Sequence, residues 1–184
     1  IAKQKGLSHP AIDAQTELEG CLRRALARNG VVVIPTFAVG RAQTLLLLIA
    51  RLKDHGFLAD VPVFLDSPMA VDATTLYGRF RAEHRLDDAE CRRMCGNATL
   101  VNTPEQSKAL DSRTGPMIIL SASGMATGGR VLHHLKAFAG DSRNFILFAG
   151  FQEPGTRGAA LLRGAPTLRI HGQEYEVRAE VGQL

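Results

Sequence analysis

The amino-acid sequence predicts an α/β fold in which a mostly parallel, Rossmann-like sheet is flanked by helices on both faces. Short, continuously apolar segments alternate with longer segments of helical periodicity, and this alternation is typical of parallel sheets buried on both sides. The chain has 184 residues, of which 45% are hydrophobic and 22% charged. This length and composition predict one compact domain that spans residues 1–184.

The first half of the chain contains two helix–strand pairs. Apolar residues recur at helical spacing over residues 14–29, and an Asn-Gly pair separates this helix from a buried strand at 31–35. A second helix is expected at 40–52, ahead of a strand at 61–65. Ser67 is expected to cap a third helix, since Pro68 suits the first turn.

The second half continues the alternation after a charged region, 77–96, that is expected to be helical. We expect strands at 98–101, 117–120 and 144–149, and helices at 104–110, 128–138 and 155–162. A closing β-hairpin near the C-terminus is expected from 167–170 and 175–178, which flank His171-Gly172.

Charge and cysteine content narrow the class of protein. The net charge is +4, carried mostly by arginine, which favours an acidic partner; a surplus spread over a solvated surface is the alternative. With 5% aromatic residues and no Trp, the sequence shows no evident platform for stacking bases. The three cysteines are expected to be reduced thiols. Neither a signal peptide nor a membrane span is visible, so we expect a cytoplasmic protein without a membrane partner.

The most informative segment is residues 116–136, a buried strand, a glycine-rich loop and an amphipathic helix. Glycines at 124, 128 and 129 allow an anion to approach the main chain, and Ser123, Thr127 and Arg130 offer donors to phosphate oxygens. The alternative is a tight strand-to-helix turn in which Thr127 caps the helix.

Four loops carry unusual residues at the predicted carboxyl ends of strands, where sheets of this class bind ligands. They are residues 36–41, 66–68, 121–125 and 150–158, with Arg41, Arg130 and Arg157 nearby. Together they outline a groove for a polyanion. Met125 either packs on a base or ribose or belongs to the core, and Asp66 either shapes the edge of the groove or is structural.

Residues 33–43, 63–70, 119–135 and the Gly-Thr-Arg-Gly sequence at 155–158 resemble the β-CASP domain in content and order. This domain is inserted into the metallo-β-lactamase fold of RNA-processing nucleases, and the resemblance runs from about His9 to the C-terminus. It implies RNA as the partner, together with the metallo-β-lactamase domain of the same parent chain; a homo-dimer is left open. The residues expected to bind substrate are Phe37, Arg41, Asp66, Ser67, Ser123, Gly124, Met125, Arg130, Gly155 and Thr156.

The family's catalytic motifs are absent from the sequence. Family members cut RNA with two zinc ions held by His-x-His-x-Asp-His and further residues, and this motif does not occur here. His133 and His134 are neighbours that point about 100° apart on a helix, so they do not converge on one metal. We expect no metal and no catalytic residue in this chain, because residues 1–8 lack the acidic motif and no Ser-x-His-x-Asp follows the hairpin.

The expected function is therefore that of an RNA-binding lid domain of a zinc-dependent ribonuclease, inactive on its own. Two alternatives from other classes are a stand-alone Rossmann-like nucleotide-binding domain and a protein-interaction module. An RNA-binding domain is expected to bind a polymer with an affinity that falls steeply with salt, whereas a nucleotide-binding domain is expected to bind a mononucleotide saturably.

Overall fold

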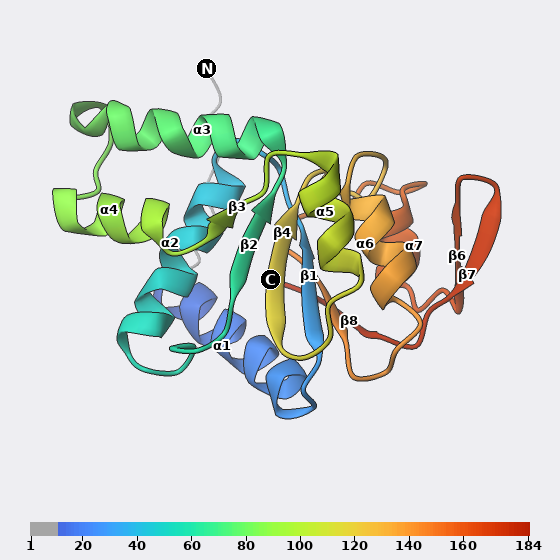
Figure 1. The fold of residues 1–184 in the computed structure, drawn as a ribbon. Helices are drawn as coiled ribbons and strands as arrows, with labels where there is room; N and C mark the ends of the chain where they lie inside the picture. Colours follow the sequence, from blue (N-terminus) through green and yellow to red (C-terminus); the bar gives the residue numbers. More distant parts are fainter. Residues whose placement is uncertain (1–10) are drawn as a thin grey trace, which may run out of the picture.

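The computed structural model describes residues 11–184 and confirms the α/β fold (Figure 1). The first ten residues of the predicted domain, with the expectations for 1–8 and His9, lie outside the described part. The helices, in chain order, are α1 (Ala11–Ala27), α2 (Arg41–Asp54), α3 (Pro68–Arg79), α4 (Asp88–Gly96), α5 (Pro104–Asp111), α6 (Val131–Phe138) and α7 (Arg157–Leu162). The strands are β1 (Val31–Pro35), β2 (Val63–Asp66), β3 (Thr99–Leu100), β4 (Met117–Ser121), β5 (Phe145–Phe148), β6 (Thr167–Ile170), β7 (Gln173–Glu176) and β8 (Glu180–Gln183).

Six of the strands form one parallel sheet in the order β3-β2-β4-β1-β5-β8. The remaining two, β6 and β7, form a separate antiparallel hairpin. Within the described residues no helix is both long and apolar enough to cross a membrane.

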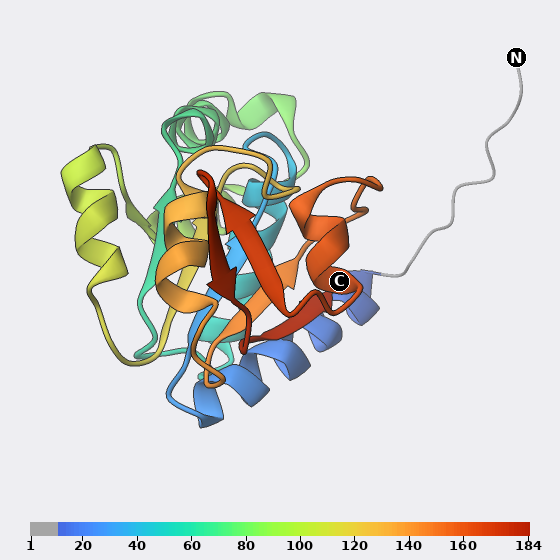
Figure 2. The same cartoon turned by 90° about the vertical axis from the view of Figure 1, so that its right-hand side faces the viewer.

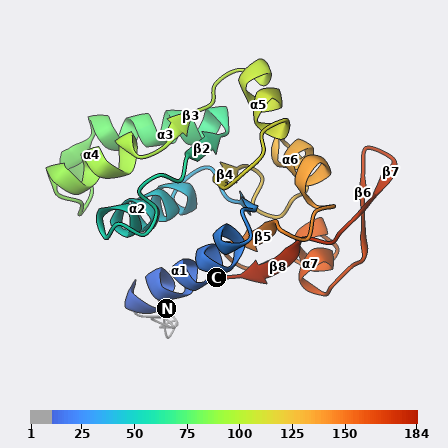
Figure 3. The same cartoon turned by 60° about the horizontal axis from the view of Figure 1, so that its bottom comes forward.

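Alternate residues of each central strand face two different hydrophobic cores. Val32 and Ile34 of β1 pack in the core that includes α1, α2, α3 and α4. Val31 and Val33 face the opposite core, which includes α5, α6, α7 and the hairpin. Figure 3 shows these two groups of helices on either side of the sheet. Burial on both faces explains why these strands read as continuous apolar runs.

The connections that follow the two central strands, β1 and β4, lead to opposite sides of the sheet. Helix α2 leads from β1 over one face of the sheet to β2, whereas α6 leads from β4 over the other face to β5. Neighbouring parallel strands whose connections leave to opposite faces open a crevice at their carboxyl ends. The loops that follow β1, β2 and β4 emerge together at the top of Figure 1.

Among the boundaries that differ from those predicted, three have a clear physical reason. The charged region 77–96 is not one helix, because α3 runs to Arg79 and a 3₁₀ turn, Arg81–Glu83, precedes α4. Helix α6 begins at Val131 rather than 128, since Gly129 takes a positive φ of 75° that ends the loop. The prediction of 175–178 for the second hairpin strand was wrong, because His171 and Gly172 form a two-residue turn with positive φ at both, so pairing starts at Gln173.

The sequence analysis missed β8, the edge strand that pairs with β5. Only Val181 in this strand is strongly apolar, and its residues are half-buried or exposed. The segment therefore lacks the hydrophobic signal that marks the central strands.

The Asn144 side chain connects the start of β1 to the end of α6 through two hydrogen bonds. Its Oδ1 accepts a hydrogen bond from the Val31 N–H at 2.8 Å, and its Nδ2 donates to the Phe138 carbonyl at 2.9 Å. The side chain is buried. Both backbone groups would lose a partner without it, and unpaired buried polar groups are costly.

We expect Asn144→Ala to lower the free energy of unfolding by about 2 kcal/mol. It leaves the Val31 N–H unsatisfied and leaves the Phe138 carbonyl with only the longer bond from the Asp141 N–H at 3.5 Å. Urea denaturation followed by circular dichroism measures this loss. Asn102→Ala, at an exposed position, is the control and should cost less than about 0.5 kcal/mol. Equal losses in the two variants would contradict the role given to Asn144.

Candidate nucleic-acid interface

The loops that follow β1 and β4 are in direct contact at the crevice. The Thr36 N–H donates to the Ser121 carbonyl at 3.0 Å, which extends the strand pairing by one bond. The ring of Phe37 lies against Gly124, where a Cβ would come within 3.0 Å of both the Phe37 ring and its backbone nitrogen. Only glycine allows this approach. The Phe37 side chain is still 46% exposed, so its outer face is open to a ligand.

Hydrogen bonds within the glycine-rich loop fix its shape. Ser123 Oγ accepts from the Thr127 N–H at 3.2 Å and lies 3.0 Å from Thr127 Oγ1. A Cβ on Gly129 would lie 2.7 Å from the Ala122 carbonyl oxygen. Thr127 does not cap α6, whose N-cap position is Arg130 with no side-chain cap. The Ser123 and Thr127 hydroxyls pair with each other at the surface of the loop.

The loop after β5 is tied to this glycine-rich loop. The buried Gln152 donates from Nε2 to the Gly124 carbonyl at 3.1 Å, and the Gly158 N–H donates to the Met125 carbonyl at 3.1 Å. Thr156 caps α7, because its Oγ1 accepts from the Ala159 N–H at 3.2 Å. The half-buried Met125 therefore lies between two loops that form one unit.

Arg41 lies at the first position of α2, at the mouth of the crevice. Its side chain has no ion pair or hydrogen bond with any residue in the described range 11–184, and it is exposed. A Cβ placed on Gly150 would lie 3.8 Å from Arg41 Nη2, which puts the guanidinium beside the loop after β5. Phe151 in that loop is 68% exposed. The crevice thus presents a cation with solvent-accessible aromatic rings near it.

A network of charged side chains lies buried beneath these loops. The Asp66 side chain, at the end of β2, is fully buried and accepts from Arg130 Nη1 at 2.7 Å and from Ser107 Oγ at 2.5 Å. His134 Nε2 lies 2.7 Å from the same carboxylate, and His134 Nδ1 lies 2.6 Å from Asp111. A histidine with a carboxylate at both ring nitrogens is stabilised in its doubly protonated form.

The pKa values of the network follow from these contacts. Burial alone lowers the pKa of His134, but its hydrogen bonds to Asp111 and Asp66 outweigh burial and raise it above the ordinary value. Burial likewise raises the pKa of Asp66, and the hydrogen bonds from His134, Ser107 and Arg130 reverse the effect and lower it. Both shifts therefore favour the charged forms of the two side chains.

The predicted substrate residues divide into two sets. Three of them serve inside the fold: Asp66 is buried, Ser67 caps α3, and Arg130 also donates to the Val101 and Asn102 carbonyls at 3.1 and 2.9 Å. The other seven meet at the strand ends: Phe37, Arg41, Ser123, Gly124, Met125, Gly155 and Thr156.

Sequence analysis missed the network around His134. The helical spacing of His133 and His134 predicts only that they do not converge on one metal, and the structure exposes His133 and buries His134 completely. The available signal was the spacing of His134 from Val131 and Phe138, which puts it on the apolar face of α6.

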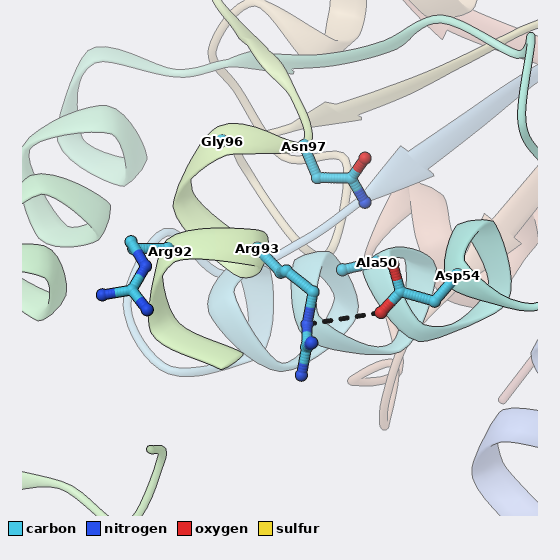
Figure 4. Close-up of a pocket in the computed structure, with 6 residues that line it drawn as sticks. All are labelled: Ala50, Asp54, Arg92, Arg93, Gly96 and Asn97. Atoms are coloured by element: carbon cyan, nitrogen blue, oxygen red, sulfur yellow. Dashed lines mark ion pairs between the residues drawn. The ribbon is translucent and has the colours of Figure 1, made fainter. Parts of the chain in front are cut away.

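A hollow of about 310 Å³ between α2 and α4 also carries two arginines, but it lies away from the strand ends (Figure 4). Arg93 Nε is 3.3 Å from Asp54 Oδ2, so this cation is already paired. Gly96 and Asn97 close the hollow with the carboxyl end of α4, whose dipole disfavours anions. This hollow does not suit a phosphate.

The buried network predicts a stability that depends on pH at both ends. The raised pKa of His134 contributes stability that is complete below its unfolded value of about 6.5 and is lost as pH rises through the folded pKa. The lowered pKa of Asp66 contributes stability that is present above about 3.8 and is lost as pH falls through the folded value. Urea denaturation across the pH range measures both limbs.

In the His134→Gln variant the alkaline limb should flatten, whereas the exposed His55→Gln control should retain it. An alkaline limb of unchanged slope in the His134 variant would refute the assignment.

The sequence of the chain is similar to a protein-family model and to several known proteins. The family model described as the Beta-Casp domain matches residues 42–161. A ribonuclease of Thermus thermophilus is 43% identical over 171 residues, which is 89% of this chain and 39% of the relative. An RNase J-like protein of Methanocaldococcus jannaschii is 32% identical, over 89% of this chain and 38% of its own length.

The transcription termination factor FttA of a Lokiarchaeum species is 35% identical over 83% of this chain and 25% of that protein. The chain thus spans between about a quarter and two fifths of the length of these relatives. Because the family model covers most of the chain, and the matched relatives include ribonucleases, the chain belongs to the β-CASP family of metallo-β-lactamase-type nucleases.

Proposed function

We propose that this chain is the RNA-binding lid of a zinc-dependent β-CASP ribonuclease, and that it has no catalytic activity by itself. The whole enzyme would hydrolyse an RNA phosphodiester with a metal-activated water in the metallo-β-lactamase domain of the same parent chain. The described residues hold no group of three or more His, Cys, Asp or Glu side chains able to bind a metal. These residues therefore do not provide a binding site for the two zinc ions, and we assign this chain only substrate contacts.

The observation that carries the proposal is Arg41 at the crevice between β1 and β4, whose side chain has no partner among residues 11–184. Its guanidinium is free to donate to phosphate oxygens, and a planar fork of donors suits phosphate well. The exposed rings of Phe37 and Phe151 lie at the same sheet edge and offer stacking surfaces that composition alone did not predict. A cation with aromatic faces is the combination that binds single-stranded RNA.

Arg130 takes a positioning role in this proposal. Its donors go to Asp66 and to two backbone carbonyls, so it holds the glycine-rich loop and β3 in place beneath the RNA. Phosphate contact is assigned to Arg41, while Ser123 and Gly124 line the crevice.

We expect Arg41→Gln to weaken binding of single-stranded RNA to a similar extent for all sequences. The slope of log affinity against log salt should fall by about 0.7 unit, the value for one lost phosphate contact. Fluorescence anisotropy with a labelled oligonucleotide measures this. Arg92→Gln, in the hollow next to α4, is the matched control with the same change of charge.

Equal losses in the two variants would mean that net charge, rather than the crevice, binds RNA. Saturable binding of a mononucleotide with an affinity like that of the polymer would favour the nucleotide-binding alternative instead.

We further expect the purified chain to retain no stoichiometric zinc after dialysis and to show no ribonuclease activity, because residues 11–184 hold no converging metal ligands. Elemental analysis and a cleavage assay with labelled RNA test this. Metal-dependent cleavage that disappears in Arg41→Gln would overturn the assignment of catalysis to another domain.

A further inference from the structure

A second cluster of basic and aromatic side chains lies outside the crevice, between α6 and the β6–β7 hairpin. His133 on α6 and His171 in the hairpin turn have ring centroids 5.6 Å apart. Lys136, one turn further along α6, has its ammonium nitrogen 5.5 Å from the centre of the Tyr175 ring. The two histidines are exposed, while Lys136 and Tyr175 are half-buried. Figure 2 shows the hairpin lying across the outer side of α6.

This cluster is joined to the glycine-rich loop by Arg157. Its Nη1 donates to the Ala126 and Thr127 carbonyls at 3.4 and 3.3 Å, and its Nε donates to the Arg169 carbonyl at 2.7 Å. The same side chain thus touches the loop and the hairpin. Figures 1 and 2 both show the hairpin turn at the end of the molecule where the strand-end loops emerge.

The charges that act on His171 are positive. Lys136 has the largest effect, followed by burial and then by His133 and Arg157, and all of them lower the pKa of His171. On the hairpin itself, Glu174 lies opposite Arg169 in the strand pairing, so its charge has a neighbouring cation. Positive charge held close together and open to solvent costs free energy that an anion would relieve.

We propose that the surface formed by His133, Lys136, His171 and Tyr175 is a second contact for single-stranded RNA, where the chain leaves the crevice. Lys136 and the protonated His171 imidazole would contact a phosphate, and the Tyr175 and His133 rings would contact a base. The proposal rests on the RNA-binding function proposed above, since continuity with the glycine-rich loop through Arg157 favours RNA over an acidic peptide.

Anion binding here should depend on pH in a defined direction. In the free protein the neighbouring cations keep His171 neutral at neutral pH. A bound phosphate favours the imidazolium, so binding takes up a proton and strengthens as pH falls from about 8 to about 5.5. The pKa of His171 should therefore rise when RNA is added.

The test is a double variant, Lys136→Gln with His171→Asn, in the 184-residue chain. Asn suits position 171 because it tolerates the positive φ of 49° found there. The matched control is Lys53→Gln with His55→Asn, which removes the same two side-chain types at the end of α2. That end lies at the opposite edge of the sheet, since α2 runs back from the carboxyl end of β1.

Binding of a labelled oligouridylate of about ten nucleotides is measured by anisotropy at several salt concentrations and at two pH values. We expect the Lys136/His171 variant to lose roughly tenfold in affinity at acidic pH and to lose about 0.7 unit of salt slope, with the control unchanged. The titration of His171 is followed separately by NMR, with and without the oligouridylate.

The outcomes separate this surface from the crevice. Loss with Arg41→Gln but not with the Lys136/His171 variant overturns the second contact and leaves the proposed function standing. Loss with the Lys136/His171 variant alone supports the second contact and removes the crevice assignment. An unchanged pKa of His171 in the presence of RNA, or binding of polyglutamate in place of the oligouridylate, overturns the proposal.

Discussion

The arrangement of the whole domain depends on one constraint, the parallel pairing of β1 with β4. Each strand must be followed by a helix that returns across the sheet, and right-handed connections leave each helix one face to cover. Since α2 and α6 cover opposite faces of the sheet, the loops that follow β1 and β4 diverge at the carboxyl ends of these strands. The bond from Thr36 to Ser121 and the packing of Phe37 on Gly124 hold those loops at the point of divergence. The crevice residues in the loops after β1 and β4 are positioned by this junction.

Beneath the junction, electrostatic balance limits what the core can tolerate. Asp66 and Asp111 supply two negative charges, and Arg130 and the protonated His134 supply two positive ones. A buried ion pair adds little net stability, whereas a buried charge without its partner is strongly unfavourable. The network therefore contributes specificity: it ties β2, α5 and α6 in one geometry, which in turn fixes where the glycine-rich loop ends.

Sequence patterns predicted the parts of this molecule that depend on local chemistry. The buried strands, the order of the elements and the four strand-end loops follow from apolar runs and turn residues, and the structure confirms them. What the sequence did not reveal depends on contacts between distant residues. The glycine-rich loop sequence predicts that Arg130 binds phosphate, but it does not reveal the hydrogen bond from Arg130 to Asp66, which is 64 residues away. The sequence did not predict strand β8, because β8 forms through backbone pairing with β5 and has no hydrophobic pattern of its own.

The contact between Phe37 and Gly124 also sets how freely each position can vary in evolution. A methyl group at position 124 would lie 3.0 Å from the Phe37 backbone nitrogen, so a larger residue there requires Phe37 to shift. Position 37 is held at its backbone but open at its outer ring face, so other flat side chains can occupy it. The crevice thus joins a tightly packed floor at Gly124 to a wall at Phe37 whose outer ring face can change without disturbing that packing.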